Sequence, residues 1–153
     1  MKLEYRAGYK YQLAKTVSIQ TPILGLRIDD EFFTLEEDGM LTIRAGYAWD
    51  GASGPTFDTM DSMGPSLVHD VFCQAQRAGQ LDYTRWHNRV DAFFKRMCKD
   101  CGMWGLRASI WHQAVTFANA GDPVQGVSNP VQEAPWPRYQ LVNGVLRFVS
   151  EEA

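Results

Sequence analysis

The fold of this chain is decided by residues 65–102, PSLVHDVFCQAQRAGQLDYTRWHNRVDAFFKRMCKDCG. Apolar side chains recur there every three or four residues in two stretches, 65–78 and 82–101, which is the spacing that aligns side chains on one face of an α-helix. The link between the stretches, residues 79–81, is short. A short link makes consecutive helices antiparallel neighbours. We therefore predict an antiparallel helix pair.

Residues that favour helix ends mark the limits of both stretches. Pro65 suits the first helical position and Gly79 suits the stop of the first helix. Asp82 is a natural N-cap for the second helix, and Gly102 follows its end. A third helix is predicted over residues 105–119, where another apolar face repeats at helical spacing.

The segments on either side of the helices have the patterns of β-strands. Apolar and polar residues alternate over 5–19, which predicts one or two strands. Asp38-Gly39 and Asn143-Gly144 each lie between short apolar runs, and such dipeptides tolerate the backbone angles of a tight hairpin turn. We expect the two hairpins to share one sheet.

The order of these elements predicts an α+β fold, with a small antiparallel sheet, the antiparallel helix pair and the third helix. We expect a single domain over residues 1–153, a length that one hydrophobic core can serve. The β layer would comprise residues of about 1–45 and 136–150, and the helical region that holds the site about 46–121. Residues 121–137, rich in Pro, Gly and Asn, are predicted to be a long loop.

Composition narrows the classes of function. The net charge is −3 and Lys and Arg form no run, so the basic surface of a nucleic-acid-binding protein is missing. The N-terminus lacks the apolar run of a signal peptide or a membrane span, which predicts a chain without a transmembrane segment that stays in the cytoplasm where it is made.

The three cysteines are expected to be reduced thiols. Cys98 and Cys101 could form half of a zinc site or a redox pair, but packing as small hydrophobic residues is the preferred interpretation.

One group of residues could carry chemistry. The glycine-containing loop 46–55 follows a strand, and its backbone could wrap around a ligand. His69 and Asp70 are adjacent in the first helix, where their side chains diverge by about 100° and can serve separate roles. Asp91 lies among apolar residues of the second helix and needs a partner. Antiparallel pairing brings it beside His69, so we predict a His–Asp hydrogen bond that leaves the other ring nitrogen free to take a proton from water.

Each of these residues also has a structural interpretation. Asp70 could complement the dipole of the first helix, with His69 as a partly exposed polar residue beside it. Asp91 could pair with Lys95 on the helix surface. Asp50 and Ser53 could stabilise a turn. His87, four residues before Asp91, could instead form a metal clip with it.

The loop residues Asp50, Ser53 and Pro55, followed by the His69-Asp70 pair and then Asp91-x-x-Phe94, resemble a family of small phage-borne proteins of unknown function. The resemblance covers residues of about 40–120. It implies a phage or prophage origin and leaves the activity open.

The same order of residues is similar to that in secreted phospholipases of the A2 type, in which a glycine-containing loop precedes a His-Asp pair and an antiparallel helix supplies another Asp. This second resemblance implies that His69 is the general base and that Asp91 orients it. Asp70, Asp50 and the carbonyl of Gly51 would bind a divalent metal, calcium as first choice and zinc as second. Cys73 stands where those enzymes have a tyrosine.

These observations predict a phage-encoded, metal-dependent hydrolase of ester bonds, with phospholipids as one substrate class. The first alternative is a non-catalytic virion or accessory protein that binds other phage proteins through its loop and sheet edges. The second is a hydrolase of the peptidoglycan cell envelope. The partners expected are thus an ester or lipid substrate or other phage proteins, with the chain made in the host cytoplasm and open to incorporation in the virion.

Overall fold

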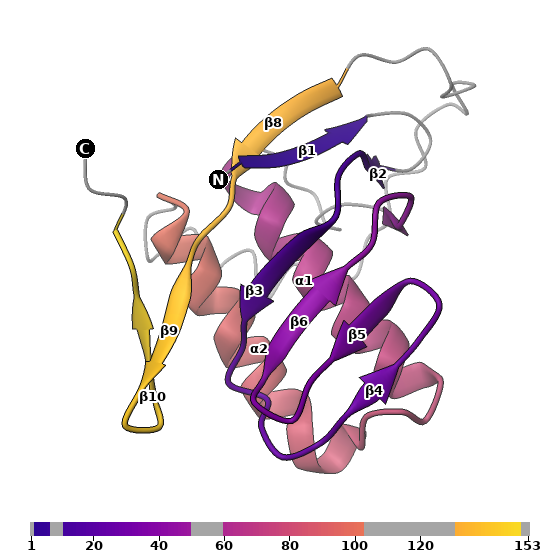
Figure 1. Cartoon of the computed structure of the whole chain (residues 1–153), viewed down its shortest axis with the longest axis vertical. Helices are drawn as coiled ribbons and strands as arrows, with labels where there is room; N and C mark the ends of the chain where they lie inside the picture. The colour runs from indigo at the N-terminus through magenta and orange to yellow at the C-terminus, as the bar shows by residue number, and fades with distance from the viewer. Residues whose placement is uncertain (1, 7–10, 50–59, 103–130, 151–153) are drawn as a thin grey trace.

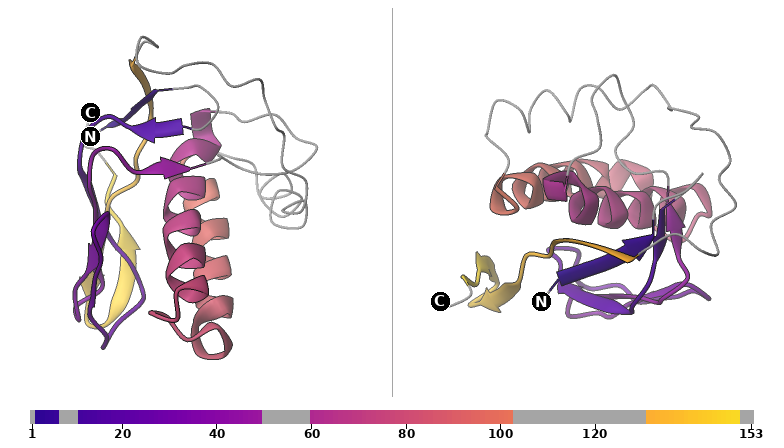
Figure 2. Two further views of the ribbon diagram at one scale, coloured as in Figure 1. Left: turned by 90° about the vertical axis from the view of Figure 1, so that its right-hand side faces the viewer. Right: turned by 90° about the horizontal axis from the view of Figure 1, so that it is seen from above.

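The computed structural model describes residues 2–6, 11–49, 60–102 and 131–150. Two long helices pack side by side and form one layer, and antiparallel strands form the layer opposite them (Figures 1 and 2). This arrangement confirms the predicted α+β class with an antiparallel helix pair. The predicted third helix, 105–119, lies outside the described residues.

The strands form three antiparallel sheets. One sheet has the order β3-β6-β5-β4, the second β7-β2-β1-β8, and the third consists of β10 and β9 alone. The strand bounds are β1 Lys2–Arg6, β2 Tyr11–Leu13, β3 Val17–Gln20, β4 Ile28–Asp29, β5 Phe33–Leu35, β6 Met40–Ile43, β7 Ala48–Trp49, β8 Val131–Pro135, β9 Tyr139–Val142 and β10 Val145–Phe148.

The second helix, α2 (Tyr83–Asp100), has the limits that its sequence predicts. The Asp82 side chain accepts a hydrogen bond from the backbone N–H of Thr84 and caps the helix. The turn before it passes through Gly79, whose φ of +74° lies in the region that glycine enters without strain. The helix pair therefore follows from local signals in the chain.

The first helix, α1 (Met60–Arg77), begins five residues earlier than predicted, so that Pro65 lies inside it. Pro65 has no N–H to donate to the carbonyl of the preceding turn, so this helix lacks one of its backbone hydrogen bonds. At Gly64, an added Cβ would lie 3.0 Å from the carbonyl oxygen of Pro135 and 3.2 Å from the Trp136 ring. The early start of α1 is thus fixed by close packing against a distant segment.

Both predicted hairpins form, but the expectation that they share a sheet is wrong. The β5–β6 hairpin belongs to the first sheet, whereas β9 and β10 pair only with each other among the described strands. Their turn has positive φ at Asn143 (51°) and Gly144 (75°), as a tight two-residue hairpin requires. The Trp136 indole donates to the carbonyl of Ser18 in β3, a backbone acceptor that a continuing ladder would otherwise use.

The prediction of a loop over residues 121–137 is wrong for its last part. Strand β8 pairs along its whole length with β1, from Lys2 opposite Pro135 to Arg6 opposite Val131. Only Ala134 of this strand is fully buried, so the sequence carries no alternation of apolar residues that would have revealed it. Residues 121–130 lie outside the described part of the chain.

The hydrophobic core lies between the two layers. Buried side chains from both helices meet those of both four-stranded sheets in one continuous cluster, with Phe33, Leu67 and Phe72 almost fully enclosed. Within the described residues, neither helix has the length and apolar character needed to cross a membrane.

Candidate functional site

The antiparallel packing of α1 and α2 brings His69 and Asp91 together. The two residues lie eleven positions before and eleven positions after Gln80 in the connecting turn, so they meet at the same level of the pair. His69 Nε2 lies 3.0 Å from Asp91 Oδ1, within hydrogen-bond distance. The His–Asp contact predicted from the sequence is therefore present.

The exposure of the two side chains suits an accessible but ordered pair. The His69 side chain is 14% exposed and that of Asp91 is 40% exposed. With Asp91 ionised, His69 donates its Nε2–H to the carboxylate, and Nδ1 then carries the lone pair. This is the tautomer in which an imidazole takes a proton from water.

The His69 ring is held from both sides. The Phe94 ring packs against it, with centroids 4.9 Å apart. Cys73, one helical turn after His69, places its sulfur 3.7 Å from Nδ1 and 3.9 Å from Nε2. Nearly equal distances to both nitrogens put the sulfur beside the face of the ring and not along the in-plane lone pair of Nδ1. The thiol is therefore a packing contact for the imidazole.

The acidity of the Cys73 thiol agrees with this role. Burial, reinforced by the negative charges of Asp70 and Asp91, raises the pKa of Cys73 to about 11, although Arg77 opposes the shift. A thiol with this pKa is neutral at pH 7, and a neutral thiol is a poor nucleophile.

Asp70 lies on the part of α1 that faces Tyr47. Burial first and the charge of Asp70 second raise the pKa of the Tyr47 hydroxyl. That hydroxyl donates to the side-chain oxygen of Gln74, at 2.8 Å. Tyr47 directly precedes β7, so Asp70 is turned toward the strand from which the predicted loop departs.

Strand β7 is tied to α1 just before the candidate site. The Trp49 indole is buried and donates to the hydroxyl oxygen of Ser66, at 3.0 Å. This hydrogen bond joins the last described residue of the predicted loop 46–55 to α1, at a position three residues before His69. The predicted loop residues Asp50, Gly51, Ser53 and Pro55 themselves lie outside the described residues.

A metal site is not complete within the described residues. Among them, no three His, Cys, Asp or Glu side chains cluster in a way that could hold an ion. Asp70 is the one predicted metal ligand that the structure describes, and it offers the hard oxygen that calcium prefers. Any further ligands from loop 46–55 remain a prediction, because residues 50–55 are outside the described part.

The other candidate residues have structural surroundings. His87 Nδ1 donates to the Tyr83 carbonyl at 2.7 Å, and the His87 ring stacks on that of Tyr83. Cys98 is fully buried, and the Cys101 sulfur contacts the Pro135 carbonyl at 4.0 Å. Cys73, Cys98 and Cys101 form no disulfide with one another.

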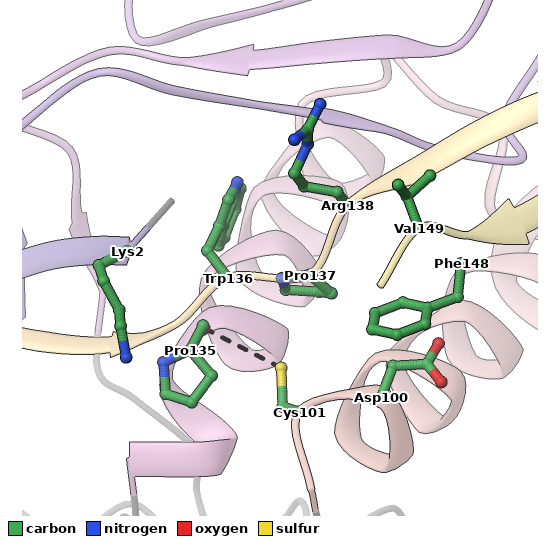
Figure 3. Close-up of a pocket in the computed structure, with 9 residues that line it drawn as sticks. All are labelled: Lys2, Asp100, Cys101, Pro135, Trp136, Pro137, Arg138, Phe148 and Val149. Carbon is green, nitrogen blue, oxygen red and sulfur yellow. Dashed lines mark hydrogen bonds between the residues drawn. The ribbon is translucent and has the colours of Figure 1, made fainter. Parts of the chain in front are cut away.

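Two cavities lined by described residues were not suggested by the sequence. One, of about 240 Å³, lies at the end of α2 among Trp136, Pro137 and Phe148. Figure 3 shows that the two cations at its rim, Lys2 and Arg138, point in different directions, so they do not converge on one ligand.

The other cavity, of about 470 Å³, is a groove on the side of α2 that faces the terminal hairpin. Arg89 and Arg96, seven residues apart with Phe93 between them, were the available sequence signal for this groove. Neither cavity is lined by His69 or Asp91.

Comparison of the chain with protein-family models, with curated proteins and with solved structures gives no match. The functional interpretation of the site therefore depends on its own geometry and chemistry.

Proposed function

We propose that this chain is a phage-encoded hydrolase of ester bonds that depends on a divalent metal ion, with phospholipid esters as one candidate substrate class. The observation that supports this proposal is the 3.0 Å contact between His69 Nε2 and Asp91 Oδ1. A carboxylate on one ring nitrogen fixes the tautomer and the ring orientation and leaves the other nitrogen to accept a proton, which is the arrangement of a general base.

In the proposed reaction, His69 acts through Nδ1. The imidazole removes a proton from water as the water oxygen attacks the ester carbonyl, and Asp91 stabilises the imidazolium that forms. The imidazolium then gives its proton to the departing alkoxide as the carbon–oxygen bond of the ester breaks. The products are a carboxylic acid and an alcohol, and His69 returns to its neutral form.

The proposed metal would be held by Asp70, by Asp50 and by the carbonyl of Gly51. Calcium is the first choice because carboxylate and carbonyl oxygens suit a hard cation. Zinc is the second choice, because it also binds carboxylate oxygens. When bound, such an ion supplies positive charge that stabilises the oxyanion formed during attack on an ester.

The proposal is tested by hydrolysis of p-nitrophenyl esters and of phospholipid vesicles, with calcium and with a chelator. His69→Ala should abolish hydrolysis and leave the far-UV circular dichroism spectrum unchanged. His87→Ala, at a half-buried position in the second turn of α2, is the matched control and should keep full activity. If His69→Ala keeps its activity, the assignment of the general base is wrong.

Metal binding is tested separately by titration calorimetry with calcium and then zinc. Binding that is weakened in both Asp50→Asn and Asp70→Asn would support the proposed ligands, because each variant removes one carboxylate and keeps the side-chain size. Unchanged affinity in Asp70→Asn would remove this residue from the metal site.

A second candidate function is a non-catalytic virion or accessory protein that binds other phage proteins. The observation in its favour is the apolar outer face of the terminal hairpin, where the cross-strand neighbours Val142 and Val145 are 41% and 56% exposed. Apolar side chains grouped on a sheet edge are typical of protein interfaces. Absence of both hydrolysis and metal binding, together with loss of partner binding on Val145→Lys, would favour this function.

A further inference from the structure

The groove of about 470 Å³ lies between α2, the β9–β10 hairpin and the loop that follows β3. The hairpin lies beside α2 (Figure 1), and among the described strands β9 and β10 pair only with each other. Apolar side chains form most of the lining: Pro22, Leu24, Ala92, Phe93, Leu141 and Leu146. This volume and this composition are typical of pockets that bind small molecules.

The charged residues of the groove are all cationic. Arg89 and Arg96 line it, and no Asp or Glu does. Their positions on α2 differ by seven residues, which places them about 10 Å apart along the helix axis. An apolar floor with guanidinium groups at its rim complements a molecule that has an aliphatic chain and an anionic head.

The two arginines differ in how they are engaged. Arg96 stacks over the Tyr139 ring and lies 3.6 Å from Asp100 Oδ2. Arg89 stacks over the Trp86 ring, with 5.3 Å to the centroid, and forms no ion pair with any carboxylate of the described residues. Arg89 therefore keeps its hydrogen-bond donors for a ligand, and a carboxylate is the group that matches a guanidinium in shape and charge.

The groove is separate from the His69–Asp91 pair. Each residue of an α-helix turns by about 100°, so Arg89 and Arg96 face away from Asp91 on α2. Phe93 packs on Tyr139 of the hairpin, whereas Phe94 packs on His69. A ligand in the groove would thus not occupy the proposed hydrolytic site.

From this geometry we propose that the groove binds an aliphatic carboxylate of the fatty-acid type, with its head group on Arg89 and its chain over Phe93 and the terminal hairpin. This inference does not depend on the proposed hydrolysis.

The test compares three ligands with the same eight-carbon chain and different head groups. Octanoate, 1-octanol and octylammonium are titrated into the full-length protein by calorimetry, below the concentrations at which they self-associate. Octanoate should bind and octylammonium should not. Binding of 1-octanol as tight as that of octanoate would overturn the proposal, because the arginines would then make no selection.

Variants locate the site. Arg89→Gln should weaken octanoate about fivefold, the upper end of what an exposed ion pair contributes. Arg85→Gln is the matched control, since Arg85 also stacks on Trp86 but does not line the groove. Ala92→Trp should block the groove from its exposed side. Unchanged octanoate binding in both Arg89→Gln and Ala92→Trp would place the ligand elsewhere and refute the proposal.

Two further outcomes are decisive. His69→Ala should bind octanoate like the wild type, so a failure of the proposed hydrolysis and a failure of this inference can be told apart. An acidic amphipathic peptide that binds in an Arg89-dependent way, with no binding of octanoate, would overturn the fatty-acid assignment and mark the groove as a peptide site.

Discussion

The two faces of α2 differ in how they place polar groups. On the face toward α1, Asp91 is joined to His69 by a direct 3.0 Å hydrogen bond, with Phe94 packed against the imidazole. On the face toward the terminal hairpin, Arg89 and Arg96 lie over aromatic rings. One helix thus carries a hydrogen-bonded His–Asp pair on one face and two cations stacked on aromatic rings on the other.

This difference has a physical reason. The His69 side chain is only 14% exposed between the two helices, so its ring nitrogen requires a defined hydrogen bond there. The groove is open to water, where an arginine keeps its charge solvated while its planar group rests on a ring. The first arrangement suits proton transfer, and the second suits selection of an anion.

The largest expected effect concerns the contact between His69 of α1 and Asp91 of α2. Asp91→Asn should lower kcat/KM for ester hydrolysis by about 10²–10⁴-fold, because an asparagine amide that donates to Nε2 leaves the proton on Nδ1. Arg85→Gln, an exposed change elsewhere on α2, should leave kcat/KM unchanged. Measurement of initial rates checks both, and a wild-type rate in Asp91→Asn would contradict the proposed role of the pair.

The face of α2 toward the groove should contribute more to the free energy of unfolding than to hydrolysis. Phe93 is 3% exposed, and Phe93→Ala should lower the free energy of unfolding by about 3–5 kcal/mol through the cavity that it leaves. Urea titration followed by circular dichroism measures this loss. The exposed neighbour Ala92, changed to Ser, is the control. A loss below about 1 kcal/mol would show that the hairpin repacks over the missing ring.

The thiol of Cys73, beside His69 on α1, should react slowly with alkylating reagents. With its pKa raised from 9.0 to about 11, Cys73 has a thiolate fraction at pH 8 on the order of a hundredfold below that of an unperturbed thiol. Alkylation by iodoacetamide should accelerate as pH rises toward 11, as followed by mass spectrometry of peptides. The urea-unfolded chain is the control and should react at the ordinary rate. Fast alkylation of the folded protein at pH 7 would instead indicate an activated thiol.

The raised thiol pKa also has a consequence for stability. The folded state holds the Cys73 proton more tightly than the unfolded state between pH 9 and about 11. The stabilisation is therefore fully present below pH 9 and is lost as pH rises through the folded pKa. Cys73→Ala should make the decline of stability over this range shallower, as measured by thermal melts at successive pH values.

The smallest expected effect is a loss of stability that does not distinguish the two faces of α2. Asp82 caps α2 by accepting from the Thr84 N–H at 3.0 Å, and Asp82→Ala should cost about 1 kcal/mol of unfolding free energy. Asp82→Asn should retain most of it, because asparagine also caps helices. Neither hydrolysis nor octanoate binding should change at temperatures well below unfolding. Loss of one activity alone would indicate that the N-terminus of α2 belongs to that face.

The sequence was informative where its signals are local. The helical spacing of apolar residues, the Gly79 stop and the Asp82 cap predict the helix pair, and antiparallel pairing alone then predicts the contact of His69 with Asp91. The Asn143-Gly144 hairpin was predicted for the same reason, since the dipeptide itself adopts the positive φ angles that the turn needs.

The sequence was not informative where distant segments meet. Strand β8 has one fully buried side chain, and its pairing with β1 joins opposite ends of the described chain. The early start of α1 depends on Gly64 packing against Pro135 and Trp136. The groove, too, exists only because the terminal hairpin lies beside Arg89 and Arg96.

By itself, therefore, the sequence determined the α+β class, the helix pair and the His69–Asp91 contact, because periodicity and helix-end residues act over a few positions. Only the tertiary structure decided the sheet order, the separation of the terminal hairpin and the cationic groove. These features arise from contacts between residues far apart in the chain, and the free energy of such contacts depends on shapes that no local pattern records.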